Sequence, residues 1–66
     1  MLEMTEKTKA FLMKNVPAAM DVSDVNDALD MIYDWIDLNG FRADGLYNAK
    51  GVAAQAAYDD LFMSND

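Results

Sequence analysis

Apolar residues recur every three to four positions over most of the chain, which is the spacing of amphipathic α-helices. The clearest run lies in the middle, where five apolar residues share one helix face: Val25, Ala28, Leu29, Ile32 and Ile36. We predict a helix over 23–38, with Asp21 or Ser23 as its N-cap. Gly40 is expected to end it in a left-handed conformation, with Phe41 making the apolar contact of a Schellman motif.

A shorter helix is predicted over residues 5–15. Thr5 is a suitable N-cap, and Glu6 lies in the first turn, where the helix dipole favours an anion. Pro17 ends this helix, because the residue before a proline is pushed out of the α region. The segment carries three of the five basic side chains of the protein: Lys7, Lys9 and Lys14.

The third predicted helix covers residues 49–63 and begins after Asn48, which is a good N-cap. Its bulky face is formed by Ala54, Tyr58, Leu61 and Phe62, and its opposite face is nearly smooth because it carries Ala49, Ala53 and Ala56. Gly51 lowers the helix propensity of the first turn, so we expect it to permit a close approach between helices. The intervening segment 41–47 is predicted to be a loop with a turn at Asp44-Gly45.

These elements predict an all-α fold, a compact three-helix mini-bundle with short loops. A chain of 66 residues forms one domain at most, so we assign residues 1–66 to a single small helical domain.

A row of five aspartates follows the central predicted helix at spacings of three and four residues: Asp24, Asp27, Asp30, Asp34 and Asp37. Residues so spaced lie one above another, so the carboxylates share one side. Neighbouring like charges cost roughly 0.2–0.5 kcal/mol per pair on an isolated helix. Asp59 and Asp60 add an unfavourable charge near the end of the third helix. The row has two interpretations. It is a solvated helix face, or it is a functional surface that meets a basic partner or imitates nucleic-acid phosphates. The uncompensated electrostatic penalties slightly favour the functional interpretation.

A narrower apolar stripe borders the aspartates: Met31, Trp35 and Leu38. One interpretation is core, because a central helix is contacted on two sides. The other is a ridge for self-association or partner binding, because aromatic and Met residues are enriched at interface centres. On the second interpretation Trp35→Ala lowers affinity more than helix content, whereas on the first the variant unfolds.

The residue types argue against a metal, a cofactor and catalysis. The chain has no Cys and no His, which removes disulfides and the usual zinc and iron ligand sets. Residues 37–40 have the D-x-N-G order of part of an EF-hand, but aligning Gly40 puts Trp35 and Leu46 at essential ligand positions. Acid–base chemistry would rest on carboxylates, Lys or Tyr, with little room for a dry pocket. We therefore expect no metal, no cofactor and no enzymatic activity.

Charge and hydropathy narrow the class of partner. The net charge of −7 disfavours direct contact with nucleic acid or an anionic membrane surface. The hydrophobic fraction of 53% is too high for a disordered tail and leaves apolar surface for a second copy or another protein. No apolar run approaches the roughly 18 residues of a membrane span. The lack of cysteine fits a cytoplasmic protein, which is the location we expect.

We predict a small acidic protein that acts as a protein–protein interaction or regulatory module and self-associates as a homodimer. The contact residues are expected to be the five aspartates together with Met31, Trp35 and Leu38. The partner is a second copy or another protein with a basic or apolar surface. The alternative is an acidic decoy, in which the aspartates occupy the nucleic-acid groove of a DNA- or RNA-binding protein and inhibit it.

Overall fold

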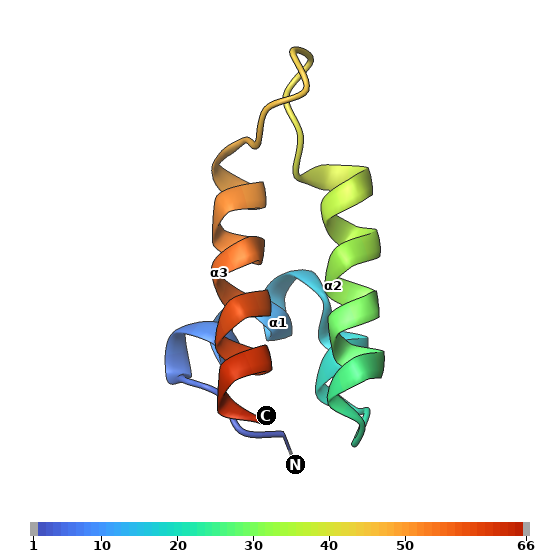
Figure 1. Cartoon of the computed structure of the whole chain (residues 1–66), viewed down its shortest axis with the longest axis vertical. Coiled ribbons are helices and arrows are strands. Elements are labelled where there is room, and N and C mark those ends of the chain that lie inside the picture. The colour runs from blue at the N-terminus through green and yellow to red at the C-terminus, as the bar shows by residue number, and fades with distance from the viewer. Residues whose placement is uncertain (1, 66) are drawn as a thin grey trace.

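The computed structural model describes residues 2–65 and confirms the all-α three-helix mini-bundle (Figure 1). The elements are α1 (Glu6–Asn15), a short 3-10 turn η1 (Pro17–Met20), α2 (Val25–Asn39) and α3 (Ala49–Ser64). Met1 and Asp66, which belong to the predicted domain over 1–66, lie outside the described residues.

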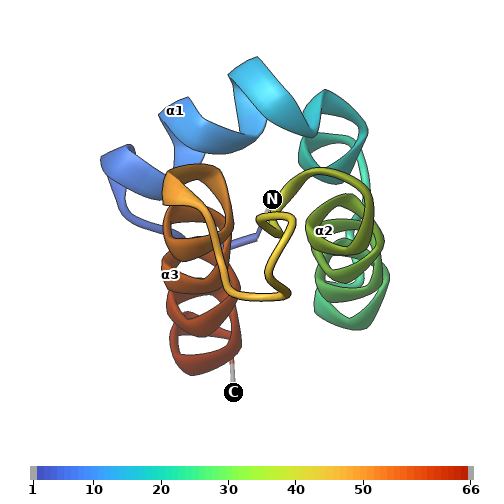
Figure 2. The same ribbon diagram turned by 90° about the horizontal axis from the view of Figure 1, so that it is seen from above.

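Two helices form one layer and the third lies across it. α2 and α3 run side by side in opposite directions and are joined by a loop at the top of Figure 1. α1 crosses behind this pair, and it contacts α3 and η1 (Figure 2). η1 in turn packs against α2, so one face of the α2–α3 layer is covered by the N-terminal part of the chain.

The core is built from all three helices. Its largest fully buried side chains are Leu12 of α1, Ile32 of α2 and Leu61 of α3. The apolar stripe predicted on α2 is buried as expected, with the exception of Val25, which is half-buried. On α3 the predicted bulky face is only partly buried, because Phe62 is 54% exposed.

The predicted N-caps of α1 and α3 are confirmed, and the predicted N-cap of α2 is not. The Thr5 hydroxyl accepts the Thr8 N–H, and the Asn48 side chain accepts the Gly51 N–H at 2.8 Å, as predicted. The prediction of Asp21 or Ser23 as the cap of α2 was wrong, because Asp24 has an extended backbone and accepts the Asn26 N–H at 2.8 Å. Asp24 is therefore a capping residue in front of the helix.

Gly40 follows α2 as its C-cap and lies close to Gly51 of α3. Its φ of −96° is right-handed, so the predicted left-handed cap with a Schellman contact from Phe41 was wrong. Instead, Gly40 and Gly51 are both buried against each other, and a Cβ placed on Gly51 would overlap the carbonyl oxygen of Gly40. The close approach predicted at Gly51 is confirmed. Asn48 strengthens this junction, because its backbone N–H donates to Gly40 O at 2.9 Å and its Nδ2 donates to Asn39 O at 2.8 Å.

The N-terminal segment is hydrogen-bonded to the end of α3. The Thr5 N–H donates to Asp60 Oδ2 at 2.9 Å, and the Thr5 hydroxyl donates to the same oxygen at 3.2 Å. Asn65 bonds both backbone groups of Glu3, at 2.9 Å and 2.7 Å. Asp60 thus lies at the N-terminus of α1, where an anion is favoured, and this compensates for its position near the end of α3.

Acid is expected to remove the stabilisation that Asp60 provides. The backbone N–H of Thr5, with the hydroxyls of Thr8, Thr5 and Ser64, holds the pKa of Asp60 below its ordinary value of 3.8. Because the folded-state pKa is the lower one, the contribution is fully present above 3.8 and is lost as the pH falls through the folded-state pKa. We expect Asp60→Asn to unfold at lower urea than wild type at neutral pH, and the difference to narrow below 3.8.

The control for this prediction is Asp59→Asn, because the Asp59 carboxylate accepts its hydrogen bond from Gln55 of the same helix. Asp59→Asn should follow wild type at both pH values. A difference between Asp60→Asn and wild type that stays constant with pH would contradict the assignment.

Candidate protein-interaction surfaces

The predicted aspartate row lies on the outer side of α2 and is exposed along its whole length. Asp24 is engaged as the N-cap, which leaves four carboxylates on the helix itself: Asp27, Asp30, Asp34 and Asp37. We refer to these four as the acidic face. The two ion pairs found within residues 2–65 are Lys9–Glu6 at 3.6 Å and Arg42–Asp44 at 2.9 Å, so no cation of this range neutralises the acidic face.

The predicted apolar stripe is divided by the fold. Met31 and Trp35 are half-buried and pack against the core. Trp35 meets Phe11 of α1 edge-to-face, with ring centroids 5.5 Å apart and an interplanar angle of 85°. Leu38, by contrast, is 84% exposed and belongs to the same exposed side of α2 as the acidic face. The structure therefore keeps only Leu38 of the stripe as a freely accessible apolar side chain.

A second exposed apolar group lies at the loop end of the α2–α3 pair, and sequence analysis did not single it out. Phe41 and Tyr47 form an isolated antiparallel bridge, with ring centroids 5.0 Å apart, and Leu46 beside them is 62% exposed. Gly45, with a φ of 87°, permits the tight turn between them. The signal was available, because a loop that carries three large apolar residues is unusual for a soluble surface.

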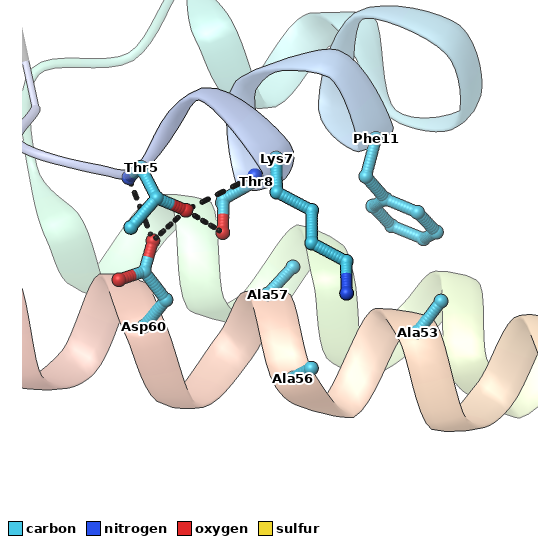
Figure 3. Close-up of a pocket in the computed structure, with 8 residues that line it drawn as sticks. All are labelled: Thr5, Lys7, Thr8, Phe11, Ala53, Ala56, Ala57 and Asp60. Atoms are coloured by element: carbon cyan, nitrogen blue, oxygen red, sulfur yellow. Dashed lines mark hydrogen bonds between the residues drawn. The ribbon is translucent and has the colours of Figure 1, made fainter.

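A groove of about 250 Å³ runs between α1 and α3 (Figure 3). Its floor is made of the methyl groups of alanines on α3, including Ala53 and Ala56, and Phe11 closes one end. The Lys7 side chain extends from α1 across the groove toward α3. A neighbouring hollow shares Phe11 and Ala53 and is lined by two further cations, Lys14 and Lys50.

We refer to the groove and the neighbouring hollow together, with Lys7, Lys14 and Lys50 at their edges, as the lysine groove. The smooth alanine face of α3 was predicted from the sequence, but its position opposite the lysines of α1 was not. The spacing of Lys7 and Lys14, seven residues apart on one side of a helix, was the signal that could have indicated it.

Within residues 2–65, no three acidic side chains converge where they could hold a metal ion. None of the helices in this range has the length and apolar character needed to cross a bilayer. In the same range, every buried side-chain polar atom has a hydrogen-bond partner. The features that stand out are therefore on the surface.

Comparison with known proteins gave no match to a family model, a curated protein or a solved structure.

Proposed function

We propose that this protein is a non-enzymatic protein-interaction module that binds its partner through the acidic face and Leu38. The observation that carries the proposal is the set of exposed carboxylates on α2, which no cation within residues 2–65 neutralises, beside a leucine that is 84% exposed. Such a face keeps several small electrostatic penalties on its helix, and a complementary cationic surface would relieve them.

The arrangement resembles the anatomy of a small protein–protein contact. An exposed leucine supplies an apolar anchor, and the charges around it orient the partner and speed the encounter. Because the carboxylates lie on a regular helix rather than on a loop, their relative positions are fixed before binding, which lowers the entropy cost of association.

The acidic decoy is the second candidate, and it uses the same carboxylates. Their regular steps of three and four residues place successive charges roughly 4.5–6 Å apart along the helix axis, as a phosphate mimic requires a repeating charge. The two candidates differ in their need for Leu38. A decoy relies on charge alone, so its binding would fall steeply with salt and would tolerate Leu38→Ala. The interaction module would lose affinity with Leu38→Ala.

A charge-matched pair of variants tests the proposed surface. The face variant Asp30→Asn/Asp34→Asn/Asp37→Asn and the control variant Glu3→Gln/Asp21→Asn/Asp59→Asn each remove three exposed negative charges. Immobilised wild type and both variants are exposed to host lysate, and retained proteins are quantified. We expect any specific partner to bind the face variant about tenfold more weakly or worse, since each exposed ion pair contributes up to about 1 kcal/mol.

The control variant should retain the same partner as wild type. Equal losses in both variants would mean that only net charge matters, and unchanged retention by the face variant would overturn the proposed function. Both variants alter exposed positions, so their unfolding free energies should stay within about 0.5 kcal/mol of wild type.

A further inference from the structure

The cations of the lysine groove lack partners of their own. Lys7, Lys14 and Lys50 are exposed, and no carboxylate of residues 2–65 lies within ion-pair distance of them. The other two cations of the chain, Lys9 and Arg42, are the ones that form the two ion pairs of this range. All of the cationic charge that is free within the described chain is thus gathered around one groove.

The acidic face matches this groove in spacing. Lys7 and Lys14 are seven residues apart on α1, and Asp30 and Asp37 are seven residues apart on α2. At about 1.5 Å of rise per residue, each pair spans roughly 10.5 Å along its helix. An α2 helix laid along α1 would therefore bring both carboxylates to both ammonium groups at once, in either direction.

The apolar parts are complementary as well. The groove has a floor of alanine methyl groups, which leave room for a larger side chain, and Phe11 provides an apolar wall, while the carboxylate of Asp60 in the same lining is bonded to Thr5. On α2, Leu38 directly follows Asp37 and is 84% exposed. A leucine that enters the alanine-floored groove beside the ion pair of Asp37 would supply the buried apolar centre of the contact, and the ion pairs would form its charged rim.

We propose that the lysine groove of one copy receives the acidic face and Leu38 of a second copy, so that the protein associates with itself head to tail. This inference rests on the proposed function, because it takes the acidic face to be the binding surface and names what binds there. The two surfaces share no residue and lie on different helices, so one copy can use both at once. Such a contact repeats into a chain or closes into a ring.

Charge reversal tests the pairing directly. The groove variant is Lys7→Glu/Lys14→Glu, and the reversed-face variant is Asp30→Lys/Asp37→Lys; all four positions are exposed, so both variants should fold. Sedimentation velocity over a concentration series measures association of each protein alone and of an equimolar mixture. We expect wild type to form species larger than a dimer and each variant alone to associate about tenfold more weakly or worse.

The mixture supplies the decisive result, because it restores both pairings: native face with native groove, and reversed face with reversed groove. We expect association of the mixture to return to that of wild type and to weaken with added salt. A mixture that stays monomeric, or a wild type that is monomeric throughout, overturns the inference. Monomeric wild type that takes up decanoate, a simple anionic amphiphile, would assign the groove to a small ligand instead.

Failure here is distinguishable from failure of the proposed function. Suppose that wild type is monomeric but the variant Asp30→Asn/Asp34→Asn/Asp37→Asn still loses the lysate partner. Then only the inference that a second copy occupies the lysine groove is overturned. If changing the aspartates abolishes neither self-association nor capture of the lysate partner, both the head-to-tail inference and the proposed function are overturned.

Discussion

Replacing Gly51 with alanine is expected to lower the free energy of unfolding by about 3 kcal/mol. The added Cβ would overlap the backbone carbonyl of Gly40, and backbone at a helix junction cannot move aside as a flexible side chain can. A chain of this size has a total stability of only roughly 3–5 kcal/mol, so the variant should keep at most about 2 kcal/mol, and at the lower end about half of its molecules should be unfolded. Urea denaturation followed by far-UV circular dichroism measures the change.

The sign of the effect separates the close contact from intrinsic helix propensity. Alanine in a helix is favoured over glycine by up to about 1 kcal/mol, so propensity alone predicts a more stable variant. Val52→Ala is the neighbouring control, because Val52 is 59% exposed and should change stability by less than about 0.5 kcal/mol. A Gly51→Ala protein more stable than wild type would show that the helices do not meet at this point.

Trp35→Ala is expected to cost about 2–3 kcal/mol of folding free energy, less than a fully buried tryptophan because the side chain is half-buried. The ring packs against the core and meets Phe11 edge-to-face, so its loss removes an aromatic contact between α1 and α2. Thermal and urea unfolding measure the effect. Tyr33→Ala is the matched control, because Tyr33 lies on the same helix and is 59% exposed.

A double-mutant cycle with Phe11→Ala isolates the aromatic contact. We expect a coupling energy of about 0.5–1.5 kcal/mol between Phe11 and Trp35. If Trp35→Ala were as stable as Tyr33→Ala and the coupling energy were zero, Trp35 would be an interface residue, as the second interpretation of the apolar stripe required.

Features that depend on neighbouring residues could be predicted from the sequence. The three helices follow from apolar spacing, and the caps Thr5 and Asn48 follow from side chains that bond a backbone N–H three residues ahead. The cap of α2 was harder, because Asp21, Ser23 and Asp24 are all good N-caps within four positions. Which of them has the extended backbone depends on where η1 ends, and periodicity carries no information about that.

Features that depend on distant residues could not be predicted. The periodicity of the sequence predicted that Trp35 borders the acidic face, but it could not predict that Phe11 of α1 would pack against it. Gly40 looked like a left-handed cap because glycine usually is one, whereas its partner Gly51 belongs to another helix. The lysine groove exists only because α1 lies against the alanine face of α3. The exposure of the aspartates, in contrast, follows from their position opposite the apolar stripe.

The bonds between the N-terminal segment and the end of α3 have a consequence for the order of folding. Thr5 and Asp60 are 55 residues apart, and Glu3 and Asn65 are 62 apart, so these bonds close a loop of almost the whole chain. The α2–α3 hairpin closes a much shorter loop and loses less chain entropy in doing so. We expect the hairpin to form first and α1 to dock last, which makes α1 the segment that opens most readily in the native state. One wall of the lysine groove is then the least protected of the three helices against hydrogen exchange, whereas the helix that carries the acidic face is among the more protected.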